Sequence, residues 1–308
     1  MSKIEPSIQT HTLGTPLEMP RPKVAKGRSL WADAWMRMRR DRLAMVCLGI
    51  VIFYAVVAIL VALNLIATKW GQTVGIEYQP PSLERWELWF GADIFGRSVL
   101  LKTVYGCYIS MTVGFASALI SIPIGVSLGA LAGYFGKWVD ELITWFYTTI
   151  SNIPSILLIL SMSFVLGKGL AIICLVLGTT SWPGVCRLIR GEFMKHKERE
   201  YVQAARSLGA GNSRRIFIHI LPNVSHLIII NFSFLFVAAI KTEVILSYLG
   251  MGVQGVPSWG TMIDEAKLEL ARGVWWQLAA ASGAMLIVVL ALNILIDALR
   301  DALDPKLK

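Results

Sequence analysis

The chain has 308 residues, of which 55% are hydrophobic and 16% are charged, and its mean hydropathy is +0.61. Soluble domains carry about 25% charged residues, and a chain with so few would expose large apolar patches to water. The composition therefore excludes soluble, disordered, collagen-like and coiled-coil proteins and favours a protein embedded in a bilayer. The net charge is +9, but the basic residues lie between apolar runs, which is typical of membrane topology rather than of nucleic-acid binding.

Before the first apolar run, residues 1–42 are polar and basic. Residues 1–27 show no apolar period and are expected to form a flexible tail. From Ser29 onward, Trp31, Trp35 and Met38 fall at helical spacing among arginines, which predicts either an interfacial helix or a simple extension of the first span into water. Both alternatives remain open at this point.

Six apolar runs are long enough to cross the hydrocarbon core, which takes about 20 residues. Their expected bounds are 43–67, 109–133, 142–166, 169–188, 224–249 and 274–296. The sequence therefore predicts an all-α integral membrane protein with six transmembrane helices. The first span is followed by an external segment, 68–108, and by a core, 109–308, that holds the other five spans.

The distribution of basic residues predicts the orientation. With the N-terminus inside, 21 of the 29 Lys and Arg residues fall in inner segments and six in outer segments, and two lie near span ends. Lys and Arg accumulate on the cytoplasmic side of membrane proteins. We therefore expect both termini in the cytoplasm and residues 68–108 in the periplasm.

Two features of the spans predict packing and bending. Gly125, Gly129 and Gly133 recur every fourth residue in the second span, and bare backbone at this spacing allows another helix to approach closely. Pro123 and Pro154 each remove a helical hydrogen bond, so bends are expected at these positions.

The longest basic loop between spans, 187–222, contains a predicted helical hairpin. Residues 200–208 are good helix formers with an acid at the start, and Gly209 is expected to end that helix. Asn212 or Ser213 is expected to cap a second helix that runs to Leu221, and Pro222 to begin the fifth span. Ala204 and Ala205 make one side of the first helix small, so that another protein can come close.

This stretch resembles the EAA loop of bacterial ABC importer permeases, whose pattern is Glu-Ala-Ala, a Gly shortly after it, and an Ile-x-Leu-Pro end. The departures are Gln203, which replaces the Glu, and His219, which replaces the first apolar residue of the end. The resemblance implies that the loop couples the permease to an ATPase. The expected coupling residues are Gln203, Ala204, Ala205, Ser207, Gly209, Leu221 and Pro222.

Three further segments, 90–100, 246–254 and 297–307, resemble motifs of the dipeptide, oligopeptide and nickel group of these permeases. The resemblance implies the second permease of a peptide importer, of the oligopeptide-like branch, in the bacterial inner membrane. It implies a type I importer fold, a homologous second permease, two ATP-binding subunits and a periplasmic peptide-binding protein as partners. Nickel chelates and peptide-like antibiotics remain alternative solutes, and a secondary transporter is the less favoured alternative.

No catalytic set is expected in the chain. The spans contain no Ser–His pair, acidic pair or HExxH sequence, which argues against an intramembrane protease. The chain also lacks a GxxxxGK[ST] phosphate loop, so we expect no bound cofactor, and ATP and Mg²⁺ would be held by the partner ATPases. The four cysteines and four histidines show no metal-ligand spacing.

A few charged and aromatic residues have two interpretations. Lys241 and Glu243 lie near the outer end of the fifth span and point to different sides; each could face the pathway or the partner permease, although snorkelling is the simpler explanation for Lys241. Asp93 and Arg97 are expected to form a structural ion pair or a turn rather than to contact the solute. Three tryptophans are expected in the interfacial belt: Trp259, Trp275 and Trp276.

Overall fold

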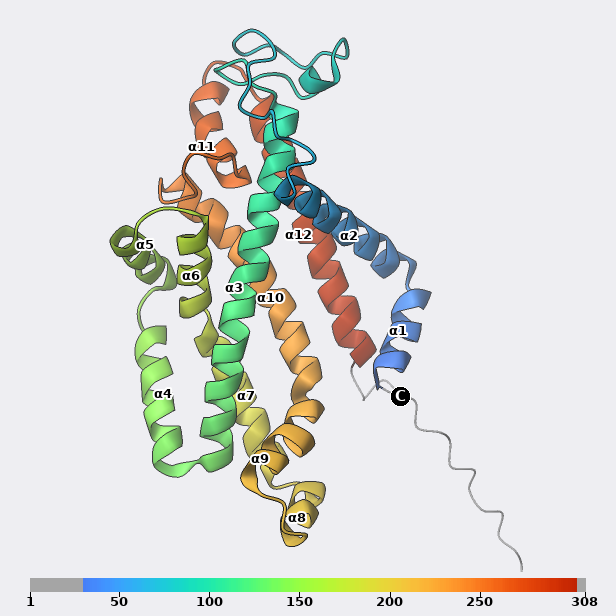
Figure 1. The fold of residues 1–308 in the computed structure, drawn as a ribbon, viewed down its shortest axis with the longest axis vertical. Coiled ribbons are helices and arrows are strands. Elements are labelled where there is room, and N and C mark those ends of the chain that lie inside the picture. Colours follow the sequence, from blue (N-terminus) through green and yellow to red (C-terminus); the bar gives the residue numbers. More distant parts are fainter. Residues whose placement is uncertain (1–29, 304–308) are drawn as a thin grey trace, which may run out of the picture.

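The computed structural model describes residues 30–303, so the expected flexible tail over 1–27 lies outside the described residues. Figure 1 shows an elongated bundle of helices, and no strand occurs between residues 30 and 303. The helices are α1 (Leu30–Arg40), α2 (Arg42–Ala62), α3 (Val99–Phe135), α4 (Lys137–Ser151), α5 (Ser155–Leu166), α6 (Leu170–Thr180), α7 (Trp182–Lys197), α8 (Glu200–Ser207), α9 (Asn212–Arg214), α10 (Leu221–Tyr248), α11 (Trp259–Leu270) and α12 (Trp276–Leu303), with a 3-10 turn at Trp86–Leu88 and a π-helical segment at Arg215–Ile220.

The predicted number of spans agrees with the structure. Five helical runs of the described chain are long and apolar enough to cross a membrane: 42–62, 99–135, 170–197, 212–248 and 276–303. A sixth span results if α4 and α5, which are bent by 87° at their junction, are counted as one. The bend falls at Pro154, where a break was predicted, because its ring prevents the helix from continuing.

Several helix ends differ from the expected span bounds. The helix α2 ends at Ala62 rather than at 67, because the chain turns with positive φ at Asn64 and Ala67. The helix α3 begins at Val99 rather than at 109. The Ser98 hydroxyl caps this start by accepting a hydrogen bond from the Leu101 N–H at 3.2 Å. The first turns of α3, which include Lys102 and Thr103, therefore lie in the stretch that the hydropathy pattern assigned to the external segment.

The first described helix is a separate element. A break at Asp41, whose carboxylate accepts from the N–H groups of Leu43 and Ala44, separates α1 from α2. Figure 1 shows α1 turned away from the line of α2 and beside the last turns of α12. A straight extension of the first span is therefore wrong, and a distinct helix precedes that span.

The central helix α3 packs against α7 through its three spaced glycines. A Cβ atom added at Gly125 would lie 2.7 Å from Val185 Cβ, one at Gly129 would lie 2.6 Å from the Cys186 carbonyl oxygen, and one at Gly133 would lie 2.5 Å from the Arg190 carbonyl oxygen. These distances leave no room for a methyl group. The backbones of α3 and α7 are therefore in direct contact, and this contact fixes α7, which leads to the basic loop.

We expect Gly129→Ala to destabilise the protein by about 1–3 kcal/mol, because the new methyl group would meet a helix backbone that cannot move alone. The matched control is Gly191→Ala in α7, where an added Cβ has nothing within 4 Å. That change should leave stability unchanged or raise it by up to about 1 kcal/mol, since Ala favours helix over Gly. Equal melting temperatures of the two detergent-solubilised variants would contradict this description of the α3–α7 contact.

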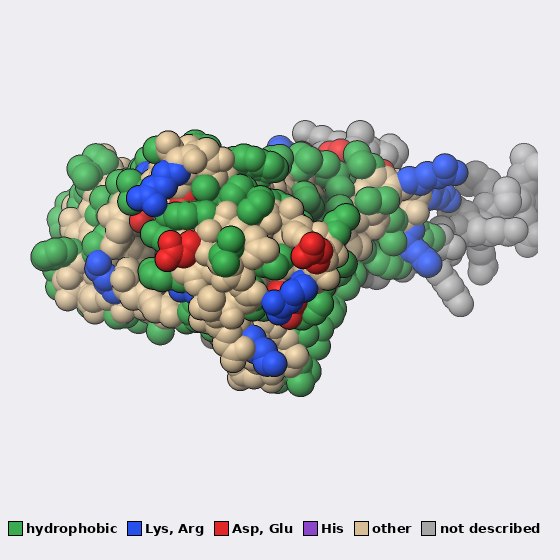
Figure 2. Space-filling view, turned by 90° about the horizontal axis from the view of Figure 1, so that it is seen from above, with side chains coloured by type: hydrophobic (Ala, Val, Ile, Leu, Met, Phe, Trp, Pro, Cys, Tyr) green, Lys and Arg blue, Asp and Glu red, His purple; other side chains and the backbone are tan. Residues whose placement is uncertain are grey.

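The two ends of the bundle carry different polar groups. The basic residues of α7, α8 and α9 lie at the end that Figure 1 shows at the bottom, and α12 runs toward that end from the end that carries α11. Figure 2 views the α11 end from above, and basic and acidic side chains both occur on that face. The side that faces the cytoplasm stays a prediction.

We expect single cysteines at Leu83 and Lys195 to be labelled from opposite sides of the membrane. Both side chains are well exposed, Leu83 before α3 and Lys195 in the last turn of α7. The four native cysteines are buried, so their replacement by alanine gives a clean background. Membrane-impermeant maleimide should reach the Leu83→Cys thiol in intact cells and the Lys195→Cys thiol only after lysis. Labelling of both from outside would refute the predicted orientation.

Candidate functional site

The predicted helical hairpin is present at the end of the bundle opposite α11 (Figure 1). The helix α8 spans Glu200–Ser207, and Gly209 follows it with a φ of +81°. The N–H groups of Leu208 and Ala210 close the last turn by donating to the carbonyls of Ala204 and Ala205. The chain then re-enters a helix at Asn212. A left-handed residue at this position is the usual way to end a helix and reverse the chain, and glycine adopts it without strain.

The cap expected for the second helix is not formed. Neither Asn212 nor Ser213 caps α9 through its side chain. The Asn212 side-chain oxygen instead accepts from the Tyr134 hydroxyl at 3.0 Å and from the Arg215 guanidinium at 2.5 Å. Asn212 therefore joins the hairpin to the end of α3 rather than closing a helix terminus.

The expected start of the fifth span at Pro222 is also different. The helical run continues from Asn212 to Tyr248, and the π-helical segment Arg215–Ile220 lies just before Leu221 and Pro222. A proline inside a helix lacks an N–H group and collides with the carbonyl of the preceding turn, and a wider turn relieves both problems. The hairpin is thus continuous with α10.

The two alanines of α8 differ in exposure. Ala205 is 8% exposed and lies on the same buried side as Val202, which is 2% exposed. Ala204 is exposed to solvent. The expectation that both alanines line one outward side is therefore wrong, because adjacent residues of a helix are about 100° apart. We define the docking face as the exposed residues Tyr201, Ala204, Ser207 and Leu208.

Gln203, at the position of the missing Glu, is half-buried. Its side-chain amide donates weakly to the Lys197 carbonyl and to the Glu198 carboxylate, both at 3.4 Å. These contacts join Gln203 of α8 to the residues that directly precede this helix. Gln203 therefore supports the loop from within and presents little of its side chain on the docking face.

We expect Gly209→Val to reduce transport steeply while leaving membrane insertion intact. An added Cβ has nothing within 4 Å, so the penalty comes from the φ of +81° rather than from a collision. The control is Gly209→Asn, since Asn tolerates positive φ better than other residues. We expect the Asn variant to retain most of the uptake. Normal uptake by the Val variant would remove Gly209 from the coupling loop.

A second polar site lies at the α11 end, around a buried lysine that the sequence did not indicate. Lys102, in the first turn of α3, is 1% exposed. Its ammonium donates to Asp93 at 2.9 Å, to Glu265 of α11 at 2.6 Å and to the side-chain oxygen of Gln277 in α12 at 3.1 Å. One ammonium thus uses its three N–H groups to hold four segments together.

Asp93 is the fully buried partner of this lysine. The predicted ion pair with Arg97 is formed, at 2.8 Å and 2.7 Å from two guanidinium nitrogens. Burial by itself raises the pKa of Asp93, but the charge of Lys102 and the hydrogen bonds from Arg97 and Lys102 outweigh burial and lower that pKa below its ordinary value. Asp93 is therefore an anion fixed between two cations.

Glu269, at the end of α11, has the opposite environment. It is 3% exposed, and neither carboxylate oxygen has a side-chain hydrogen-bond partner within the described chain. Burial, with smaller contributions from Asp93 and Glu265, raises the pKa of Glu269 above its ordinary value despite the charge of Lys102. The site therefore combines a strongly ionised acid with one that holds a proton more readily.

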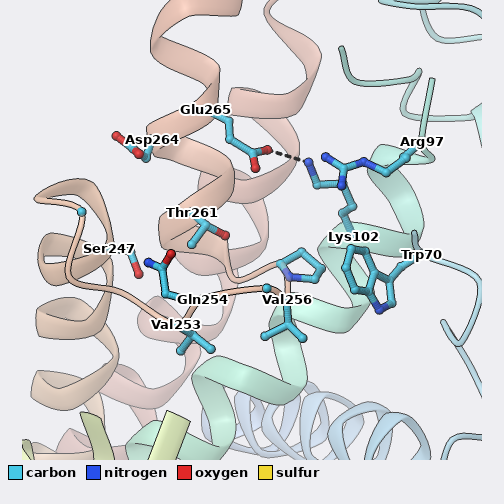
Figure 3. A pocket seen from close by; sticks show the side chains of 13 residues that line it. Trp70, Arg97, Lys102, Ser247, Val253, Gln254, Val256, Thr261, Asp264 and Glu265 are labelled. Atoms are coloured by element: carbon cyan, nitrogen blue, oxygen red, sulfur yellow. Dashed lines mark hydrogen bonds and ion pairs between the residues drawn. The ribbon is translucent and has the colours of Figure 1, made fainter. Parts of the chain in front are cut away.

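A polar cavity of about 300 Å³ opens beside this network. Figure 3 shows Arg97 and Lys102 on one side, the segment 253–257 below, and Glu265 reaching from α11 toward Lys102. Arg97 pairs with Asp93, and Lys102 pairs with both Asp93 and Glu265. Of the two acids, Glu265 is the accessible one, with 43% of its side chain exposed. The cavity is therefore a polar pocket of mixed charge at the α11 end.

Comparison with known proteins identifies the family. Residues 125–308 match the family described as binding-protein-dependent transport system inner membrane component, and residues 29–81 match the N-terminal TM domain of oligopeptide transport permease C. The chain belongs to this inner membrane component family. It is therefore a multi-pass subunit of a binding-protein-dependent transport system of the inner membrane.

Curated relatives cover nearly the whole permease. The dipeptide transport system permease protein DppC of Bacillus subtilis (strain 168) is 36% identical over 277 residues, covering 90% of this chain and 86% of the relative. The oligopeptide transport system permease protein OppC of the same organism is 36% identical over 286 residues, covering 92% of each. The glutathione transport system permease protein GsiD of Escherichia coli O6:K15:H31 is 34% identical over 299 residues, covering 94% and 95%.

Within the permease, the two charged residues of the fifth span lie in different environments. Lys241 is exposed. Glu243 is fully buried; one carboxylate oxygen accepts from the Ser247 hydroxyl at 2.7 Å, and the other has no partner within residues 30–303. A buried carboxylate in a span is a functional candidate by default, and it lies beside Ser247, which also lines the polar cavity.

The three tryptophans expected in the interfacial belt differ in their surroundings. Trp275 is 58% exposed. Trp276 donates its indole N–H to the Ala92 carbonyl at 2.9 Å. Trp259 is fully buried, and its indole N–H donates to the Thr103 carbonyl at 3.0 Å. The belt interpretation is therefore wrong for Trp259, which fastens α11 to α3.

Proposed function

We propose that this permease forms the membrane pathway of an ATP-driven peptide importer and that α8 docks on an ATP-binding subunit. The observation that supports the docking most directly is the α8 hairpin. It presents a small exposed residue, Ala204, beside Leu208, which is 88% exposed. An exposed leucine on a tight hairpin, held to α3 through Asn212, is suited to bind another protein.

The other parts of the importer follow from the family. We propose a homologous second permease, two ATP-binding subunits and a periplasmic binding protein as partners, with ATP and Mg²⁺ on the ATP-binding subunits. The names of the relatives, which refer to dipeptide, oligopeptide and glutathione transport, support peptides as the solute class. With both termini in the cytoplasm, α8 would face the ATP-binding subunits and the polar cavity beside α11 would face the periplasm.

The test is ATP-dependent uptake into proteoliposomes that hold the complete transporter. ATP is enclosed in the lumen, and the binding protein and a radiolabelled dipeptide or oligopeptide are added outside. We expect uptake with ATP and none with a non-hydrolysable analogue or with a proton gradient alone. Uptake driven by the gradient would support a secondary transporter, and uptake of a nickel chelate but no peptide would overturn the proposed solute class.

A further inference from the structure

A second pocket lies between the end of α3 and α8, on the side of α8 that is turned away from the docking face. Its volume is about 270 Å³, and its walls include three basic side chains, Lys197, Arg206 and Arg215, but one acidic side chain, Glu198. None of the three basic residues forms a salt bridge within residues 30–303. The pocket therefore carries an excess of two positive charges, whereas the pocket at the α11 end holds paired charges.

Arg215 is held in place with an unused donor. Its guanidinium lies 5.6 Å from the centre of the Tyr134 ring and donates one hydrogen bond to Asn212, which also binds the Tyr134 hydroxyl. Within residues 30–303 its Nε atom is buried and has no hydrogen-bond partner, and a buried donor without an acceptor carries a free-energy penalty.

The walls of the pocket are partly apolar. Val202 is 2% exposed, and the rings of Tyr134 and Phe135 form the side made by α3. A ligand that fits such walls has a short apolar stem and an anionic end. Guanidinium groups bind carboxylates through paired hydrogen bonds, and a nearby ammonium adds attraction.

We propose that this pocket receives the carboxylate of an Asp or Glu side chain from the ATP-binding subunit that docks on α8. The proposal rests on the proposed function. Arg206 is exposed and lies on α8, which is eight residues long, so a partner that takes this short helix into a cleft contacts the pocket side as well as the docking face. The carboxylate would meet Arg206, Lys197 and the part of the Arg215 guanidinium that lines the pocket, and would supply the negative charge that the pocket lacks.

The test combines binding measurements with chemical cross-linking of the assembled transporter. We expect Arg206→Glu to weaken binding of the ATP-binding subunit to the two permeases in nanodiscs at least tenfold at low salt. Wild-type binding should weaken as salt rises, because mobile ions screen exposed charges. The matched control is Lys195→Glu, which makes the same charge change on a side chain that is 67% exposed and does not line the pocket. Its affinity should stay within twofold of wild type.

Zero-length carbodiimide coupling identifies the partner group, since it joins a carboxylate to an amine in direct contact. We expect peptide mapping to show Lys197 joined to an Asp or Glu of the ATP-binding subunit, and Arg206→Lys to restore binding and add a second coupled site.

Unchanged binding by Arg206→Glu together with no coupling at Lys197 would overturn the proposal. A bound phospholipid or phosphate that native mass spectrometry finds in wild type, and that Arg206→Glu releases without loss of the ATP-binding subunit, would also overturn it. In either case, loss of docking in Ala204→Trp would show that α8 still binds the ATP-binding subunit, so the two proposals fail separately.

Discussion

Replacing Lys102 by Met is expected to destabilise the permease by about 3–5 kcal/mol, because it leaves the buried Asp93 carboxylate without one of its two cations. Methionine is unbranched and of similar length, so packing around the side chain should change little. Thermal unfolding of the purified protein should begin roughly 10 °C lower than in wild type. The loss should shrink as pH falls toward the range in which Asp93 takes up a proton.

The sign of this pH effect follows from proton linkage. In wild type, the lowered pKa of Asp93 means that its contribution is present above the ordinary carboxyl pKa and is lost as pH falls through the folded-state value. Without Lys102 that pKa rises relative to wild type, so acidification removes less stability from the variant than from wild type and the difference between the two shrinks. The control is Lys267→Met, whose ammonium pairs with Asp264 at the surface with 43% of its side chain exposed. That change should cost at most about 1 kcal/mol at any pH.

Replacing Ala204 by Trp is expected to remove the ATP-binding subunit from the transporter while the two permeases stay paired. Ala204 is exposed, so the indole does not disturb this chain but fills the space of a docked partner. Overpacking at a closely fitted contact costs about 1–3 kcal/mol, which weakens binding roughly tenfold to a hundredfold. Affinity purification through a tag on this chain, followed by quantification of the co-purified ATPase, measures the effect.

Two variants make this experiment specific. Lys195→Trp adds the same indole to an exposed position of α7 and should leave docking unchanged. Ala205→Trp should instead unfold the hairpin, since Ala205 faces Val202 within the chain. Limited proteolysis at the basic loop would detect that unfolding. Full ATPase recovery with Ala204→Trp would place the docking surface elsewhere on the loop.

The sequence predicted those features of the fold that depend on local pattern. The length of the apolar runs predicted the spans, and Pro154 predicted the break between α4 and α5. The glycines and small residues of the basic loop predicted the hairpin. Each of these signals is contained in a window of a few turns. The details that failed, such as the outward direction expected of Ala205, depend on which face of a helix meets the rest of the protein.

The charged site at the α11 end could not be predicted in the same way. Lys102 meets Glu265 and Gln277 across 163 and 175 residues of chain, and no local spacing relates them. The Asp93–Arg97 pair was predicted because its residues are four apart in the sequence. The contact of the Lys102 ammonium with Asp93 and with Glu265 of α11 was not predicted. The single available signal was a lysine close to an apolar span, which is costly unless it is paired.

The helical run from Asn212 to Tyr248 joins the second arm of the hairpin to the buried Glu243 over 37 residues. At ~1.5 Å per residue this run is roughly 55 Å long, so a tilt of about 10° at one end displaces the other by roughly 10 Å. A small rotation of the run at Asn212 is therefore amplified geometrically at Glu243 and Ser247. The run ends just before Gly250, which has a φ of +77°, so the segment 250–258 is the first part of the chain that can bend to absorb that displacement.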